Sequence, residues 1–267
     1  MTNNEKIAST QQLVIRVSRM GLSFSSTEEG EVVYEDYPLK SSISIAANMR
    51  EALQSSPILH QVYRHVLVMV DSPVLMIPSD QFDERLKEDY YYHAFPKKDQ
   101  QLLMFTVLAE LSSVAVFPVS KDLRTVLTDA FDNVRFVAAL TPLWHHLNQR
   151  NYTGRHQKLY AYFHDKFVDV FSFTQNRFKF FNSFGISGYS DAIYFMLAVW
   201  KQLGLSPEHD ELFVTGDIPE RDTLKAELDQ FVKRVFIINP VGEFNRASVA
   251  QIKDIPYDLV ILYVKGL

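Results

Sequence analysis

The sequence predicts an α/β protein with two halves of similar architecture. Residues 156–183 contain three short segments in which apolar and polar side chains alternate, and this period of two is typical of β-strands. After residue 188 the apolar spacing changes to that of a helix, and strand-like and helical segments then alternate as far as residue 238. A second series in the same order begins at Leu13. These observations predict a repeat of one α/β unit.

The second half is expected to begin with three antiparallel strands, at residues 156–164, 167–173 and 177–183. The loops between them, residues 165–166 and 174–176, are short enough to force neighbouring strands to run in opposite directions. Apolar side chains occupy every second position of the first strand: Leu159, Ala161 and Phe163. Such alternation predicts a strand with one buried face.

A helix is expected next, because apolar residues recur at helical spacing: Ile193, Met196, Trp200 and Leu203. Ser187 is its expected N-cap, and Gly204 ends it. A strand at 211–215, a helix at 220–231 and a strand at 234–238 follow. Residues 256–267 have strand propensity, but the repeat requires a helix there, and we predict a helix with Leu259, Leu262 and Tyr263 inward.

The first half is expected to contain strands and helices in the same order as the second half. Strands are expected at 13–18, 22–26 and 32–37, followed by a helix that has Ala46, Met49 and Leu53 on one face and is capped by Ser42 or Ser44. The later elements are a strand at 64–70, a helix at 120–131, a strand at 134–139 and a helix opening at Thr141-Pro142. In the helix at 120–131, Leu123, Leu127 and Ala130 are expected to face inward. Two unrelated meanders would also give three strands and a helix, but the continuation matches as well.

An extra block interrupts the first half at about residues 73–119. It is expected to contain a strand at 74–78, a helix capped by Ser79 and a hairpin formed by 101–110 and 113–119. Phe82, Leu86 and Tyr90 lie on one face of that helix. We therefore expect a strand-helix-strand-strand subdomain. The predicted domains are 10–150, which contains this subdomain, and 151–267.

Composition limits the classes of function. The 267 residues are 47% hydrophobic and 22% charged, which is typical of a globular chain. A net charge of -5 gives no electrostatic reason to expect nucleic acid as a partner. There is no cysteine, so disulfides and thiolate chemistry are excluded.

The polar residues 1–12 lack the apolar core of a secretion signal. The longest apolar run, Ile193–Trp200, is far shorter than the about twenty residues of a membrane span. We expect a cytoplasmic protein.

The remaining sequence motifs give few candidates for a catalytic, metal or partner-binding site. The sequence has none of the P-loop, dinucleotide-binding, nucleophile-elbow or paired-histidine zinc motifs. His145 and His146 are adjacent and diverge on a helix, so no metal site is predicted. His164-Asp165 is either an acid/base pair or a polar hairpin end. The stretch Tyr90-Tyr91-Tyr92-His93 is either an exposed loop for a protein partner or a cover for the inserted subdomain.

Three antiparallel strands, a helix and then alternating strand and helix resemble the ribonuclease H-like unit. Two such units in tandem, with a small block inserted in the first, are similar to the actin-like ATPase fold, in particular to the branch with assembly proteins of type IV pili and type II secretion. The segments Ile237-Ile238-Asn239-Pro240 and Ile255-Pro256-Tyr257-Asp258 resemble an uncharacterised bacterial family of unknown function. The resemblance implies a five-stranded mixed sheet with helices in each domain.

The same resemblance implies three nucleotide-binding signatures. In the first phosphate loop an Asp should end the first strand, but Ser18 and Arg19 stand there, and only Gly21 fits. In the second phosphate loop Asp165 is present, but Lys166 replaces the glycine. The adenosine signature needs paired glycines, and the sequence has Gly216 followed by Asp217.

These departures predict a pseudo-ATPase: a non-catalytic binding or scaffold protein that holds an unknown protein partner in the cleft between the domains or on the inserted subdomain. No cofactor is predicted. The alternative is a divergent nucleotide-binding protein or slow ATPase in which Asp165 positions magnesium and Gly216 packs near adenine. Nuclease chemistry needs a cluster of metal-binding carboxylates, and the strand at 13–18 has none.

Overall fold

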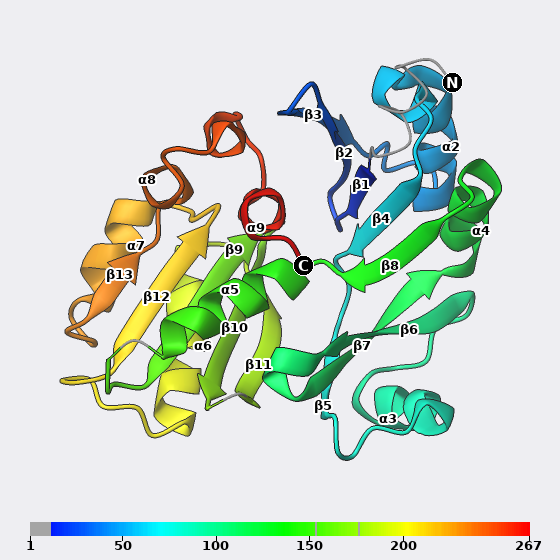
Figure 1. Ribbon diagram of the computed structural model, residues 1–267. Helices are drawn as coiled ribbons and strands as arrows, with labels where there is room; N and C mark the ends of the chain where they lie inside the picture. Colours follow the sequence, from blue (N-terminus) through cyan, green and yellow to red (C-terminus); the bar gives the residue numbers. More distant parts are fainter. Residues whose placement is uncertain (1–11, 153, 176) are drawn as a thin grey trace. The chain divides into compact units, whose positions relative to one another are not determined.

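The computed structural model describes residues 12–152, 154–175 and 177–267 (Figure 1). The chain forms two compact units, Met1–Val107 with Val114–Thr141, and Leu108–Ser113 with Pro142–Leu267. The domain limits 10–150 and 151–267 stay a prediction. The expectation about a secretion signal rests on residues 1–12, of which 1–11 lie outside the described part of the chain.

The first unit contains a five-stranded mixed sheet in the order β3-β2-β1-β4-β8. Its strands are β1 (Gln12–Val17), β2 (Gly21–Glu28), β3 (Glu31–Pro38), β4 (His65–Val70) and β8 (Val134–Ala138). β1 pairs antiparallel with β2 and parallel with β4. Short turns explain the antiparallel strands, and the connections through helices explain the parallel ones.

Two helices of this unit, α2 (Ile45–Ser55) and α4 (Lys121–Ala130), pack on each other. Ser44 caps α2, since its hydroxyl accepts the backbone N–H of Ala47 at 3.2 Å. α4 buries Leu123, Val126 and Leu127. The expectation that Ala130 faces inward was wrong, because Ala130 ends the helix and is exposed.

The inserted subdomain has the predicted strand-helix-strand-strand order. Its sheet has the order β5-β7-β6 and consists of β5 (Leu75–Pro78), β6 (Gln101–Leu108) and β7 (Ser113–Ser120). The hairpin turns through a 3-10 segment, η3 (Ala109–Leu111). The helix start at Ser79 was wrong. A 3-10 turn, η2 (Glu84–Leu86), is capped by Asp83 and leads into α3 (Lys87–Ala94).

The second unit repeats the topology with the strand order β11-β10-β9-β12-β13. Its strands are β9 (Lys158–His164), β10 (Phe167–Thr174), β11 (Arg177–Gly185), β12 (Glu211–Gly216) and β13 (Val235–Ile237). The β9–β10 turn is the predicted two-residue loop. Asn176, in the predicted loop 174–176, lies outside the described residues.

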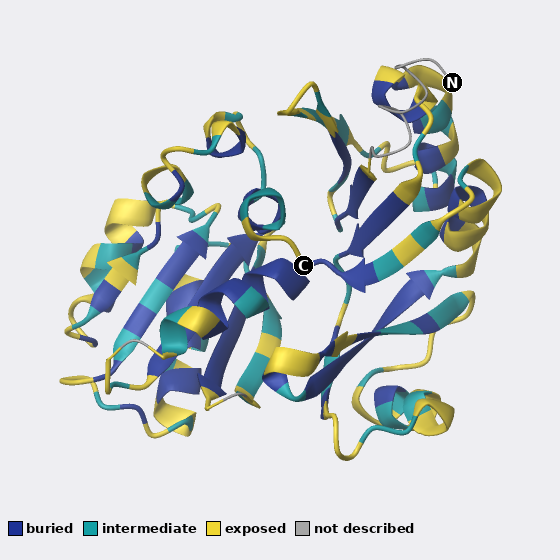
Figure 2. Ribbon diagram, in the orientation of Figure 1, coloured by how far each residue is buried: buried dark blue, intermediate teal, exposed yellow. Residues whose placement is uncertain are grey.

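β9 is buried on both faces, so the expectation of a single buried face was wrong (Figure 2). Leu159, Ala161 and Phe163 belong to a core formed with α6 (Tyr189–Gln202) and α7 (Arg221–Leu228). On the opposite face, Tyr160 stacks between Phe171 and Phe213, with ring centroids 5.6 and 5.5 Å away. Helices α5 (Thr141–Asn151) and α9 (Tyr257–Lys265) lie over that face (Figure 1). The alternation of side chains along β9 therefore separates two buried faces, one packed on α6 and α7 and the other covered by α5 and α9 (Figure 1).

The C-terminal segment is a helix, as the repeat requires. α9 buries Tyr257, Asp258, Leu259, Val260 and Ile261. Leu262 and Tyr263 are half-buried. The chain reaches α9 through α8 (Pro240–Glu243) and η4 (Ser248–Gln251). Within the described residues no helix combines the length and the apolar run needed to cross a bilayer.

Candidate functional site

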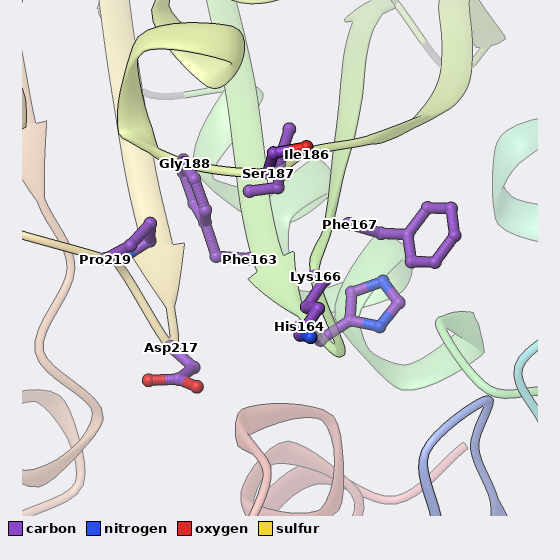
Figure 3. Close-up of a pocket in the computed structure, with 9 residues that line it drawn as sticks. All are labelled: Phe163, His164, Lys166, Phe167, Ile186, Ser187, Gly188, Asp217 and Pro219. Atoms are coloured by element: carbon purple, nitrogen blue, oxygen red, sulfur yellow. The ribbon is translucent and has the colours of Figure 1, made fainter.

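A pocket in the second unit lies where three segments meet: the β9–β10 turn, the loop before α6 and the loop after β12 (Figure 3). Its volume is about 130 Å³. Its lining is more apolar than polar. The lining residues are Phe163, His164, Lys166, Phe167, Ile186, Ser187, Gly188, Asp217 and Pro219. Lys166 and Asp217 are thus the predicted nucleotide-binding residues that line it.

The β9–β10 turn positions Asp165 and Lys166. Both residues have left-handed backbones, with φ of 46° and 63°. This is the geometry of a tight hairpin turn, which normally favours Gly or Asn. The carbonyl of Lys166 accepts the N–H of Ile186 at 2.9 Å. The Lys166 side chain is exposed at the pocket, so the turn keeps its shape without the glycine of a phosphate loop.

Gly216 is required by the packing of β12 against β9. Its φ is +96°, and an added Cβ would lie 2.1 Å from the carbonyl oxygen of Phe163. The next residue, Asp217, donates its backbone N–H to the same oxygen at 2.9 Å. A glycine at this place is therefore explained by a close approach of two strands, independently of any adenine ring.

The loop before α6 differs from the prediction. The N-cap of α6 is Gly188, with no side-chain hydrogen bond to the cap, so the assignment of Ser187 was wrong. The backbone N–H of Ser187 instead donates to the carboxylate of Asp191 at 2.8 Å. Asp191 lies in the first turn of the helix, where a negative charge is favourable.

A histidine and a buried carboxylate meet beside the pocket. Nε2 of His164 lies 2.6 Å from Oδ2 of Asp169, and these side chains are 6% and 2% exposed. Nδ1 of His164 lies 3.6 Å from Oδ2 of Asp165. Sequence reasoning missed Asp169. The register of the hairpin could have revealed it, because residues diagonal across an antiparallel pair lie on one face.

The predicted residues of the first unit form the β1–β2 turn. The hydroxyl of Ser18 accepts the backbone N–H groups of Met20 at 3.1 Å and of Gly21 at 2.9 Å. Nε of Arg19 lies 3.6 Å from Oδ2 of Asp71, which follows the end of β4. Asp71 was not among the predicted residues. The sequence feature that could have indicated Asp71 is the Asp-Ser-Pro sequence directly after the strand.

Of the two alternatives for Tyr90-Tyr91-Tyr92-His93, the exposed loop was wrong, because these residues lie in α3. Tyr91 is 2% exposed, and its hydroxyl donates to the carbonyl of Pro73 at 3.0 Å. Burial raises the pKa of Tyr91 well above its usual range. Tyr90 and Tyr92 pack on the same core at half burial, while His93 is exposed. The tyrosines thus cover the subdomain, and a partner surface at the remaining exposed atoms stays a prediction.

A second polar cluster lies among α5, α8 and α9. The carboxylate of Glu243 accepts hydrogen bonds from His146, Arg150 and Tyr257. Burial tends to raise the pKa of Glu243, but the hydrogen bonds from His146, Tyr257 and Arg150 outweigh it and hold the pKa at about 2. Burial and the nearby Glu243 carboxylate raise the pKa of Tyr257 far above its usual range. The cluster ties three helices together.

Comparison with solved structures identifies the fold. A protein of unknown function with an actin-like ATPase fold, from Bacteroides thetaiotaomicron VPI-5482, is 29% identical, with a TM-score of 0.83 over 97% of this chain and 98% of that one. The PilM-PilN type IV pilus biogenesis complex contains a chain 14% identical, with a TM-score of 0.59 over 96% of this chain and 98% of that one. No functionally curated protein matches the sequence.

The two five-stranded mixed sheets, the inserted three-stranded sheet and these neighbours confirm the actin-like ATPase fold. Residues 1–235 match the family model described as "Protein of unknown function (DUF3822)". The chain belongs to the DUF3822 family.

Proposed function

We propose that this protein is a non-catalytic binding protein on an actin-like ATPase fold. The observation that carries the proposal is the β1–β2 turn. The Ser18 hydroxyl already accepts the N–H groups of Met20 and Gly21, which are the amides that a phosphate loop would offer to a nucleotide. Ser18 also stands where a magnesium-holding acid is expected. The residues present therefore do not fit ATP with magnesium at this turn.

Two further features support a binding role. Gly216 is needed by the Phe163 backbone, so its presence gives no evidence for a retained adenosine site. PilM, a protein of the same fold, is solved in a complex with PilN. This supports the use of the fold for protein binding and assigns no partner to this chain. The exposed atoms of Tyr90, Tyr92 and His93 on α3 remain the proposed partner surface.

The test is a titration of the full chain with ATP and ADP, each with and without Mg²⁺, by calorimetry and by thermal shift. The proposal predicts no saturable heat and no shift in the melting temperature at millimolar nucleotide. A ligand bound at a hundredfold excess over its dissociation constant would stabilise the fold by about 2.7 kcal/mol. An increase in the melting temperature that corresponds to this stabilisation, measured in the presence of Mg²⁺, would refute the proposal.

The second candidate is a divergent nucleotide-binding protein or slow ATPase, and the pocket of the second unit favours it. Lys166 and Asp217 line that pocket, and the backbone of Ile186 is fixed to the turn that carries Asp165. In this version the proposed nucleotide-binding set is Ser18, Arg19, Gly21, Asp165, Lys166, Gly216 and Asp217. An Asp165→Ala or Lys166→Ala change should then weaken nucleotide binding at least tenfold. An unchanged dissociation constant in both variants would exclude it.

A further inference from the structure

We propose that His164 and Asp165 form a binding site for a transition-metal ion of the Zn²⁺ class, oriented by Asp169. The site differs from magnesium held by nucleotide phosphates, because one ligand is an imidazole nitrogen and no nucleotide is needed. All three residues belong to the β9–β10 hairpin of the second unit.

The separation of the two ligand atoms fits a shared ion. Zn²⁺ binds nitrogen and oxygen ligands at about 2.0–2.2 Å, so two ligands in a tetrahedral site lie roughly 3.4 Å apart. Nδ1 of His164 and Oδ2 of Asp165 are 3.6 Å apart. This exceeds the usual length of an N–H···O hydrogen bond. Small side-chain adjustments would place both atoms on one ion.

Asp169 supplies the outer-shell contact that histidine ligands usually have. A metal-bound histidine commonly donates its other ring N–H to a carboxylate, which fixes the tautomer and the ring orientation. Nε2 of His164 lies 2.6 Å from Oδ2 of Asp169, and that carboxyl side chain is 2% exposed. In the tautomer that carries the proton on Nε2, this N–H donates to Asp169, and the lone pair of Nδ1 lies on the side of Asp165.

The surroundings hold the imidazole in this orientation. The ring of Tyr162 stacks on that of His164, with centroids 5.1 Å apart and planes 24° apart. The two-residue turn holds the Asp165 backbone in the left-handed region, at φ 46°. A divalent ion would bring two positive charges to a place where two carboxylates flank one imidazole. The His164 and Asp165 side chains are only 6% and 19% exposed, so both ligand groups lie in a largely buried environment.

The chemistry of the ligands selects the class of metal. Imidazole suits Zn²⁺, Co²⁺ and Ni²⁺, whereas Mg²⁺ and Ca²⁺ prefer oxygen ligands alone. Two protein ligands leave two positions of a tetrahedral zinc ion open, one more than in catalytic zinc sites, which have three protein ligands. Because His164 also lines the pocket, those positions can take water or a donor atom of a ligand bound in it.

The test is a titration of the full chain with Co²⁺, followed by visible absorption, and with Zn²⁺, followed by calorimetry. Wild type should bind one equivalent at the site, and His164→Gln should abolish the Co²⁺ spectrum of that site. Asp169→Asn should weaken Zn²⁺ binding by about 10–100-fold, as loss of such an outer-shell partner does. A tenfold excess of Mg²⁺ should not displace Co²⁺.

Controls separate this site from other histidines and from misfolding. His156 and His209 stack with ring centroids 6.3 Å apart, so His209→Gln is the matched histidine control and should leave binding unchanged. Asp165→Asn keeps the turn, because Asn tolerates a left-handed backbone. Folding of every variant is checked by circular dichroism. The proposal is wrong if wild type binds no Co²⁺ or Zn²⁺, if folded Asp165→Asn and Asp169→Asn both keep wild-type affinity, or if binding follows His209.

Discussion

The hydroxyl of Ser18 accepts the backbone N–H of Gly21 at 2.9 Å, so the β1–β2 turn is closed on itself. The same hydroxyl accepts the N–H of Met20, and the N–H of Ser18 donates to the carbonyl of Gly21. The resemblance to nucleotide-binding members of this fold implies that the equivalent amides contact phosphate there. Here they stabilise the turn instead.

A Ser18→Ala change should destabilise the first unit. Two backbone donors lose their acceptor, and a typical hydrogen bond contributes about 1 kcal/mol. We expect the free energy of unfolding to fall by about 1–2 kcal/mol, measured by urea denaturation. The exposed Ser41 provides the matched control, since Ser41→Ala should change stability by less than about 0.5 kcal/mol. Equal stability of the two variants would show that the turn does not depend on Ser18.

Glu243 should make stability depend on pH at the acid end. Its pKa is lowered from 4.5 to about 2 in the folded chain. The stabilisation is therefore present above pH 4.5 and is lost as the pH falls through the folded value. A shift of this size is worth up to roughly 3 kcal/mol, which solvent screening reduces to about 2 kcal/mol.

Urea denaturation of wild type and Glu243→Gln at several pH values tests this. The advantage of wild type should be largest near pH 6 and should shrink between pH 4.5 and 2. The control is Glu208→Gln, which removes an exposed partner of Lys233 and should have little effect at any pH. A wild-type advantage that stays constant across this range would contradict the assigned role of the Glu243 charge.

Gly216→Ala should be among the most damaging substitutions of a small residue in the second unit. The new Cβ would meet the Phe163 carbonyl oxygen at 2.1 Å, and the backbone lies at φ +96°. Overpacking and strain together should cost about 3 kcal/mol or more. Gly188→Ala is the matched control, because nothing lies within 4 Å of a Cβ built there. If thermal denaturation showed similar stability for both variants, the close approach of β12 to β9 would not explain Gly216.

Tyr91 should matter for folding of the inserted subdomain. Tyr91→Ala removes a buried ring and should cost about 3–5 kcal/mol, while Tyr91→Phe loses only the bond to Pro73 and should cost about 1 kcal/mol. Tyr194 is 69% exposed, so Tyr194→Ala should be nearly neutral. A cost below about 1 kcal/mol for Tyr91→Ala, measured by chemical denaturation, would mean that this ring does not support the subdomain.

Much of the fold could be predicted because side-chain periodicity reports local structure directly. The alternation along Leu159, Ala161 and Phe163 predicted β9, and the short loops predicted its pairing. The same alternation did not reveal that Tyr160 is buried too, because burial of the second face depends on the packing of helices α5 and α9 over the sheet (Figure 1), which the local pattern does not report. Residues 257–265 have strand propensity but form a helix. The helix was predicted from the internal repeat and not from propensity.

The site was less predictable, because distances between distant residues decide it. Lys166 and Asp217 were predicted from the resemblance, and both line one pocket. Asp71 and Asp169 were missed, since neither belongs to a short motif. The helix start at Ser79 was wrong because Asp83 caps a later turn, and one polar residue cannot be preferred over another without the backbone.

The most direct test of the proposed function is the titration of the full chain with ATP in the presence of Mg²⁺, measured by calorimetry at millimolar nucleotide. The closed Ser18 turn predicts no saturable binding, with and without Mg²⁺. Saturable binding with micromolar affinity that requires Mg²⁺ and weakens in Asp165→Ala would contradict the account.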